Sequence, residues 1–230
     1  MKLVRCVPVD AIYFGFRIRL FLGESPLRFE VFHETLEVME KNLLLEKLKP
    51  RTAIDVGAHM GSYSLILSKT CEKVVALEPQ EAVRRVLLRN LRLNRVNNVH
   101  VLPYAVSSVS GISAEIVGAG DSAKVLLGKG TITTITVDDV VKKFFPDKGP
   151  DFIKIDVEGH ELEVLKGALK TLNERKPLLL VEVWEHNNIN VRRLLEKARY
   201  QVIDGHGLTN FELAKNVLAI PGNCNVVELL

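Results

Sequence analysis

Two acidic residues directly follow an apolar segment in FIKIDVEGHELEVLKGA, residues 152–168. The apolar residues favour burial in a strand, yet Asp156 and Glu158 come next, flanked by Lys154 and His160. Titratable groups brought together in this way are candidates for general-base catalysis. An acid just before a helix is also favoured by the helix dipole, by about 0.3–1 kcal/mol, so one of the two has a purely structural alternative.

Acids also stand at the ends of three other apolar segments. Asp55 lies in AIDVG, Glu78 ends VVALE, and Glu182 lies in LLLVEVWEH, where His186 follows as another candidate base. The carboxyl ends of parallel strands meet at one edge of the sheet, where ligands bind. Since a buried carboxylate without a partner costs several kcal/mol, we expect these acids to hold a cationic or hydroxyl-rich ligand. A lone histidine is more often a surface residue, and this alternative stays open for His186.

A glycine turn follows the first of these segments, in DVGAHMGSYSL at residues 55–65. Gly57 and Gly61 predict a strand-to-helix turn whose backbone amides approach a ligand closely. Their spacing is GxxxG, which argues against the GxGxxG fingerprint of nicotinamide and flavin sites. Glu78 lies about 20 residues after Gly57, the offset at which an acid accepts hydrogen bonds from ribose hydroxyls.

The elements that must position these residues alternate from residue 52 onward between apolar strands and helices. This alternation predicts an α/β fold with a doubly wound, mostly parallel sheet. The last two strands, near YQVIDG and FELAKNVLAIP, have no long helix between them and are expected to pair as an antiparallel hairpin. We expect residues 1–50 to form a strand and a helix, with the helix at 29–48, and residues 51–230 to form the main domain.

Two further expectations concern individual segments. The glycine-rich region 111–130 is weakly patterned and predicts an insertion. The helix after FIKIDVEG is expected to bury four leucines in the core: Leu162, Leu165, Leu169 and Leu172.

Composition limits the classes of protein. The chain has 230 residues, 47% of them hydrophobic, and a net charge of +3, which permits an anionic partner without demanding one. Its 3 cysteines are far apart and lack metal-ligand spacing, so we expect a reducing, cytoplasmic location. No apolar run is long enough to span a bilayer, and the start does not resemble a signal peptide.

One predicted helix is rich in arginine. Its basic residues indicate either a solvent-exposed face or a binding surface for RNA phosphates. We favour the solvent-exposed face, because the chain has few aromatic residues on which RNA bases could stack. The basic residues are Arg84, Arg85, Arg89, Arg92 and Arg95.

Five segments together resemble the FkbM family of S-adenosylmethionine-dependent methyltransferases, over about residues 50 to 205. The pattern DxGAxxG is shared by most class I methyltransferases, whereas KIDVEGxExxVLKGA is closer to this family's own motif. The segments are AIDVGAHMGSYSL, VVALEPQEAVRRVLLRNLRLN, NVHVLPYAVSSVSG, FIKIDVEGHELEVLKGA and KPLLLVEVWEH.

The resemblance implies a Rossmann-like class I methyltransferase fold that uses S-adenosyl-L-methionine. By position, Asp55, Gly57 and Gly61 would hold the methionine end of the cofactor, and Glu78 the ribose. Tyr104 and Ala105 would lie at the adenine. The neighbours Ala58, His59 and Pro79 complete the predicted cofactor site. The family usually has Asn in place of His59.

The resemblance also implies methylation of a hydroxyl on a sugar, glycan or small-molecule scaffold. Asp156 is our first choice for the base or the acceptor-aligning residue, with Glu158, Glu182 and His186 as further candidates. Acidic side chains could also hold Mg²⁺, which the sequence does not establish. The rival hypotheses are an RNA methyltransferase and a non-catalytic cofactor-binding module.

Overall fold

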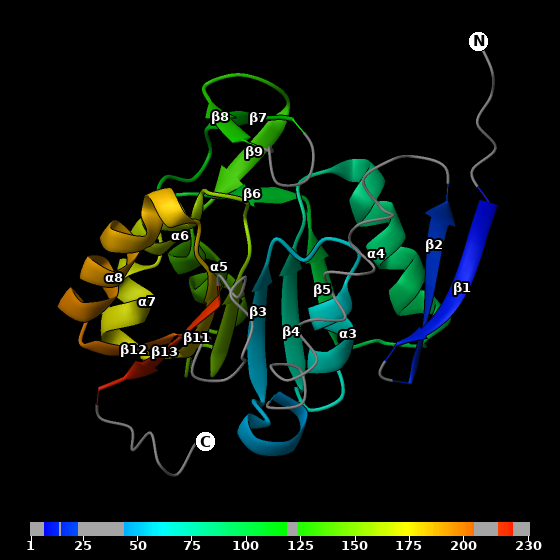
Figure 1. Cartoon of the computed structure of the whole chain (residues 1–230), viewed down its shortest axis with the longest axis horizontal. Helices are drawn as coiled ribbons and strands as arrows, with labels where there is room; N and C mark the ends of the chain where they lie inside the picture. Colours follow the sequence, from blue (N-terminus) through cyan, green and yellow to red (C-terminus); the bar gives the residue numbers. More distant parts are fainter. Residues whose placement is uncertain (1–6, 14, 23–43, 119–123, 205–215, 223–230) are drawn as a thin grey trace.

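A seven-stranded sheet forms the centre of the molecule (Figure 1). The computed structural model describes residues 7–13, 15–22, 44–118, 124–204 and 216–222. The strand order is β12-β13-β11-β10-β3-β4-β5. Its strands are β3 (Thr52–Val56), β4 (Lys73–Leu77), β5 (Val99–Leu102), β10 (Phe152–Ile155), β11 (Leu178–Glu182), β12 (Tyr200–Asp204) and β13 (Asn216–Pro221).

Five of these strands are parallel, and the last strand pairs antiparallel with both of its neighbours. The parallel strands are β5, β4, β3, β10 and β11, and β13 runs antiparallel between β11 and β12. The predicted doubly wound sheet with a C-terminal antiparallel hairpin is therefore confirmed.

Helices cover both faces of the sheet. On one face lie α3 (Ser62–Leu67) and α4 (Glu81–Leu93). On the other lie α5 (Val137–Phe144), α6 (Glu161–Lys166), α7 (Leu169–Glu174) and α8 (Asn188–Lys197). Strand β3 shows why both faces are apolar, since Ile54 and Val56 face the second layer and Ala53 faces the first. A parallel strand that is buried on both faces has a nearly continuous apolar sequence.

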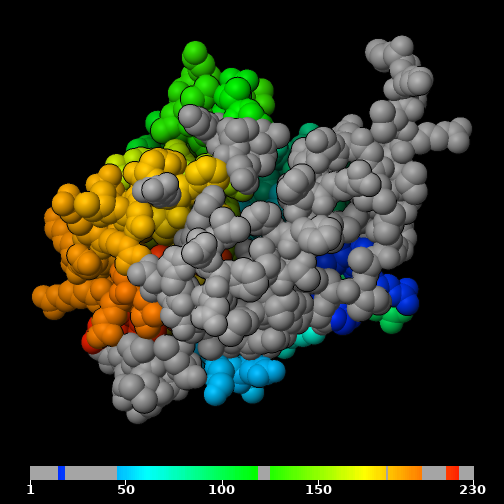
Figure 2. All heavy atoms as spheres, in the orientation of Figure 1, coloured from blue at the N-terminus to red at the C-terminus, as the bar shows by residue number. Residues whose placement is uncertain are grey.

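A second, four-stranded sheet stands beyond the carboxyl ends of the central strands and protrudes at the top of the molecule (Figures 1 and 2). Its order is β6-β9-β7-β8. The strands are β6 (Tyr104–Val106), β7 (Ser113–Val117), β8 (Lys124–Leu127) and β9 (Ile132–Ile135). The described part of the predicted insertion thus forms the β7–β8 hairpin of this sheet.

The N-terminal residues that the structure describes form a hairpin beside α4. It consists of β1 (Val7–Tyr13) and β2 (Phe16–Leu22). The side chain of Asn94, at the end of α4, bonds to the backbone of Arg17 in β2. It accepts a hydrogen bond from the N–H of Arg17 at 2.8 Å and donates one to the carbonyl of Arg17 at 2.7 Å. Most of the helix predicted at 29–48 lies outside the described residues, and Leu44–Leu48 forms a single π-helical segment, η1.

The helix after β10 differs from the prediction. It is interrupted at Gly167 and Ala168, which separate α6 from α7. A Cβ at Gly167 would lie 2.2 Å from the carbonyl oxygen of Ser107, so the backbones touch here. As a result Leu165 and Leu172 are buried, Leu162 is partly buried, and Leu169 is 43% exposed. The prediction that Leu169 belongs to the core is wrong.

None of the helices in the described part of the chain is long and apolar enough to span a membrane.

Candidate functional site

The switch point of the central sheet brings two chain segments into backbone contact. The chain leaves β3 for β4 and β5, and then returns to β10 on the other side of β3. Gly57 follows β3 with φ 78, and a Cβ there would lie 1.7 Å from the carbonyl oxygen of Asp156. The backbone N–H of Asp156 donates a hydrogen bond to the carbonyl of Val56 at 3.0 Å. The glycine turn and the acidic segment are therefore adjacent, at the position where α/β sheets bind ligands.

The glycine turn is held by hydrogen bonds within the protein. The backbone N–H groups of Gly57 and Ala58 both donate to the carbonyl of Leu77 at 3.0 Å. The backbone N–H of His59 donates to Oε2 of Glu78 at 3.1 Å. These three amides are bonded within the protein, to Leu77 and Glu78. That other amides of the turn approach a ligand stays a prediction. The turn also fixes the position of Glu78.

Besides Gly57, two more residues of the turn have a positive φ. Gly61 is the N-cap residue of α3 with φ 95, and a Cβ there would lie 2.3 Å from the side chain of Leu87. His59 has φ 48. Asn and His are both enriched among the residues other than glycine that adopt this conformation. His59 therefore meets the same backbone requirement as the Asn usual in the FkbM family.

Glu78 is a buried carboxylate in a fixed position at the end of β4. It is 4% exposed, and its Oε1 accepts a hydrogen bond from the backbone N–H of Gln80 at 2.8 Å. Burial raises the pKa of Glu78, while the N–H of Gln80 and the proximity of His59 lower it. Because each carboxylate oxygen has two acceptor positions, this side chain can still accept ribose hydroxyls. The residues present thus fit the ribose of the predicted cofactor.

Asp55, within β3, is also a buried acid. It is 1% exposed and accepts a hydrogen bond from the hydroxyl of Ser64, on α3, at 2.5 Å. It does not cap the helix, since the N-cap residue is Gly61. Its contact with the methionine end of the cofactor stays a prediction.

The residues predicted at the adenine follow β5. The backbone N–H of Glu78 donates to the carbonyl of Leu102 at 3.1 Å, which places the end of β5 beside Glu78. Tyr104 is half-buried and Ala105 is buried, both in β6. The role of this segment at the adenine stays a prediction.

Pro79 contributes a backbone contact next to Glu78. The guanidinium of Arg84 donates to the carbonyls of Glu78 and Pro79 at 2.9 and 2.8 Å. This arginine of the basic helix is therefore bound within the protein.

The acidic segment combines a charged pair with a strained backbone. The Asp156 side chain is 28% exposed, and its Oδ2 lies 3.8 Å from Nζ of Lys154. Glu158 has φ 51. Helix α6 begins only at Glu161, and the acids of its first turn are Glu161 and Glu163. The helix dipole therefore accounts for those two acids and not for Glu158.

Two residues that the sequence did not indicate hold this segment in place. Glu161 is fully buried and accepts a hydrogen bond from the backbone N–H of Gly159 at 2.6 Å. The side-chain amide of Asn187 donates to Glu161 at 2.9 Å and to the carbonyl of Gly159 at 2.7 Å. Burial raises the pKa of Glu161, and the bond from Asn187 lowers it. In the sequence Glu161 is only an acid at a helix start, and Asn187 only one residue of a polar turn.

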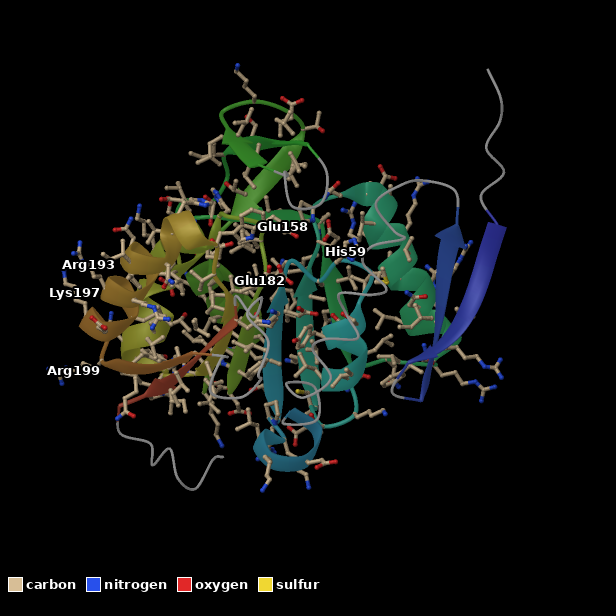
Figure 3. All side chains as sticks on the ribbon, in the orientation of Figure 1. His59, Glu158, Glu182, Arg193, Lys197 and Arg199 are labelled. Atoms are coloured by element: carbon tan, nitrogen blue, oxygen red, sulfur yellow. The ribbon has the colours of Figure 1, made fainter. Side chains whose placement is uncertain are left out.

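His186 and Glu182 reach the same edge of the sheet from β11. A Cβ at Gly159 would lie 3.2 Å from Cε1 of His186, so this exposed histidine lies against the acidic segment. Glu182 is half-buried at the end of β11. Figure 3 shows His59, Glu158 and Glu182 near the upper ends of the central strands, below the second sheet.

His160 contacts the residue that directly follows β6. Its Nε2 lies 3.0 Å from the hydroxyl of the buried Ser107. Burial lowers the pKa of His160, and the charge of Glu163 raises it. This contact connects the start of α6 to the second sheet.

Within the described residues, no group of three or more His, Cys, Asp or Glu side chains is arranged to hold a metal ion.

The comparison with protein families agrees with this arrangement. The model of the methyltransferase FkbM domain matches residues 55–202, which include every candidate residue described above.

Two named relatives are methyltransferases. The chain is 30% identical over 189 residues to "Methyltransferase sdnD" of Sordaria araneosa, and the match covers 65% of this chain and 73% of that protein. It is 37% identical over 168 residues to "Hexuronic acid methyltransferase AglP" of Haloferax volcanii, covering 68% of this chain and 66% of that protein.

A solved structure has the same fold. The methyltransferase FkbM from Methylobacillus flagellatus superposes with a TM-score of 0.56 at 21% identity, and the match covers 74% of this chain. The chain spans 44% of that longer protein. The central sheet is thus that of a class I methyltransferase.

Proposed function

Because the chain belongs to the FkbM methyltransferase family, we propose that it transfers a methyl group from S-adenosylmethionine to a hydroxyl of a carbohydrate. The backbone contact between Gly57 and Asp156 carries this proposal, because it joins the predicted cofactor turn to the predicted base. The name of the Haloferax volcanii relative supports a hexuronic acid as the first acceptor to test. The name of the Sordaria araneosa relative specifies no acceptor, so small-molecule scaffolds belong in the same screen.

The cofactor supplies an electrophilic methyl group bound to a sulfonium. Glu78 would hold the ribose, since its carboxylate is fixed by the backbone N–H groups of His59 and Gln80. Asp156 would accept the proton of the acceptor hydroxyl as the new oxygen–carbon bond forms. Positioning of the two reactants can contribute on the order of 7–11 kcal/mol. A general base adds about 10²- to 10⁴-fold to the rate.

The other acids and His186 would orient the acceptor. Glu158 and Glu182 can accept hydrogen bonds from neighbouring sugar hydroxyls, which suits a carbohydrate better than an apolar acceptor. His186 is exposed, and it lies against the same segment as Glu158. It is therefore a candidate second base.

We also propose a cytoplasmic location, which the cysteines support. Cys71 is a buried thiol, and burial raises its pKa to about 12. Such a thiol is neither a nucleophile nor a metal ligand at neutral pH. An odd number of widely spaced cysteines fits a reducing compartment.

The test is the substitution Asp156→Asn, which keeps the size of the side chain and removes its basicity. We expect folding and the affinity for S-adenosylhomocysteine to be retained, and single-turnover methyl transfer to fall by about 10²-fold or more. Thermal melting, calorimetry and a labelled-cofactor assay with hexuronic acids and other sugars measure the three quantities. Asp147→Asn makes the same chemical change at an exposed loop position and serves as the control. Transfer by Asp156→Asn at the rate of the control would contradict the catalytic role.

A further inference from the structure

A lysine is buried in the centre of the sheet. Lys154 is 1% exposed and lies within β10, in register with Asp55 of β3 and Leu180 of β11. Burial of an ammonium group is costly unless it is paired and hydrogen-bonded, and an apolar side chain of similar size often serves stability at least as well. Stability alone therefore does not account for a lysine at this position.

The ammonium of Lys154 contacts residues of β13 and α3 and the acid that follows β10. Its Nζ donates to Oδ1 of Asn216, in β13, at 3.2 Å. It lies 4.9 Å from the ring centre of Tyr63, in α3, where the ring face attracts a cation. The third contact is Oδ2 of Asp156, at 3.8 Å. Asn216 and Tyr63 are 8% and 4% exposed, so both of these contacts are made by buried groups.

The geometry of the pair separates the roles of its two members. The Asp156 side chain is 28% exposed and Lys154 only 1%, so an acceptor can reach the carboxylate and not the ammonium. A separation of 3.8 Å is too long for a hydrogen bond but short enough for strong electrostatic attraction. Lys154 can therefore stabilise the charge of Asp156 without forming a hydrogen bond to this oxygen.

We propose that Lys154 is a positioning residue, which keeps Asp156 ionised and oriented for proton transfer while Asn216 and Tyr63 hold the ammonium in place. This inference depends on the proposed function, because it assigns Lys154 a task only if Asp156 is the base.

Other charged groups lie around the pair, among them the buried Asp55, which is in register with Lys154. Glu161 lies on α6, and the charge of Asp156 contributes to raising the pKa of Glu161, after the larger effect of burial. Glu182 ends β11 and directly follows Val181, the residue in register with Ile155. Glu158 and His186 lie on the neighbouring loops. Lys154 thus offsets the repulsion among several carboxylates.

The experiment compares the parent with Lys154→Met in single-turnover transfer from about pH 5 to about pH 9, with saturating cofactor. We expect the rate at neutral pH to fall about tenfold or more. We also expect the pH below which the rate declines to rise by about one unit, since removal of a nearby cation favours the protonated carboxyl. The affinity for S-adenosylhomocysteine, measured by calorimetry, should change by less than about threefold. A purely structural role would lower the melting temperature without moving the acid limb of the pH profile.

Two further variants keep the test decisive. Lys166→Met removes an exposed lysine that pairs with Glu163, and its pH profile should match that of the parent. Lys154→Gln is neutral but can still donate to Asn216, so it replaces Lys154→Met if the latter does not fold, with the same expected shift.

The outcomes distinguish the two proposals. An acid limb that stays in place in a folded Lys154 variant overturns the positioning role alone. Parent activity that is insensitive to Asp156→Asn overturns the proposed function, and this inference with it.

Discussion

At the residue scale, the backbone of Glu158 is the main sign of strain in the candidate site. Its φ of 51 lies in the left-handed region, which costs an L-residue with a side chain roughly 1–2 kcal/mol. Strain of this kind often accompanies function, because the surrounding structure must hold the residue in place. The hydrogen bonds from Gly159 and Asn187 to Glu161 provide such support on the C-terminal side.

The comparison of Glu158→Gly with Glu158→Ala separates strain from chemistry. Both variants lose the carboxylate, but glycine adopts this φ without a steric cost. We expect the glycine variant to be more stable than the alanine variant by about 1 kcal/mol in chemical denaturation. We expect both to transfer methyl groups more slowly than the parent, by a similar factor. Equal stability of the two variants would contradict the assignment of strain, and parental rates would exclude a role for the carboxylate.

His160 predicts a pH dependence of stability. Burial lowers the pKa of His160 in the folded protein, so the unfolded chain binds a proton more readily. Stability should therefore decrease as the pH falls through the ordinary value of 6.5 and below. In His160→Gln this part of the decrease should be absent. Melting curves of both proteins between about pH 5 and pH 8 test the difference. Parallel profiles would show that His160 does not contribute.

At the element scale, the side-chain amide of Asn187 links the acidic segment to the start of α8. Asn187 ends the 3₁₀ turn η3 (Glu185–Asn187) and donates one hydrogen bond to Gly159, in the loop before α6, and one to Glu161, the first residue of α6. One acceptor, Glu161, is fully buried. Asn187 therefore fixes the relative position of the two loops that carry Glu158 and His186.

Asn187→Ala should lower both stability and activity. Loss of a hydrogen bond to a buried carboxylate costs about 1.5–3 kcal/mol, and the loosened loop should slow methyl transfer with little effect on cofactor affinity. The control is Asn188→Ala, whose side chain accepts a hydrogen bond from Arg192 on the exposed side of α8. The control should change the free energy of unfolding by less than about 0.5 kcal/mol. Similar effects of the two substitutions would contradict the special role of Asn187.

The sequence predicted the parts of the fold that depend on periodicity. Alternating apolar strands and helices indicated the doubly wound sheet, and the position of Asp156 after its strand indicated the edge where it lies. The break at Gly167 was missed, because it results from contact with Ser107, some sixty residues earlier in the chain. The buried role of Glu161 was missed for the same reason, since its partner Asn187 comes from another loop.

At the scale of the whole molecule, the distribution of charge argues against RNA as the acceptor. The chain carries a net charge of +3. Two arginines of α4 are engaged within the protein, since Arg84 binds backbone carbonyls and Arg85 pairs with Glu81 at 2.5 Å. Neutralisation of several phosphates at once requires a larger set of available cations.

We therefore expect no tight RNA binding at physiological salt. A gel-shift titration should show only weak binding by the parent, with little further change when Arg85, Arg89 and Arg92 are replaced by Ala. Tight binding that declines steeply with salt, and that is lost in the triple variant, would instead support the RNA methyltransferase hypothesis.

Exchange of the β7–β8 hairpin between family members is a way to seek variants that methylate other acceptors. The hairpin belongs to the second sheet and not to the seven central strands, and it carries exposed apolar side chains at Val117, Leu126 and Leu127. The Gly57–Asp156 contact makes the central site a single unit that tolerates little exchange, whereas a hairpin outside the sheet can be replaced whole. We expect chimaeras that exchange only the hairpin, residues 113–127, for that of another family member to keep the central sheet, including β13 with Asn216, and the Gly57–Asp156 contact.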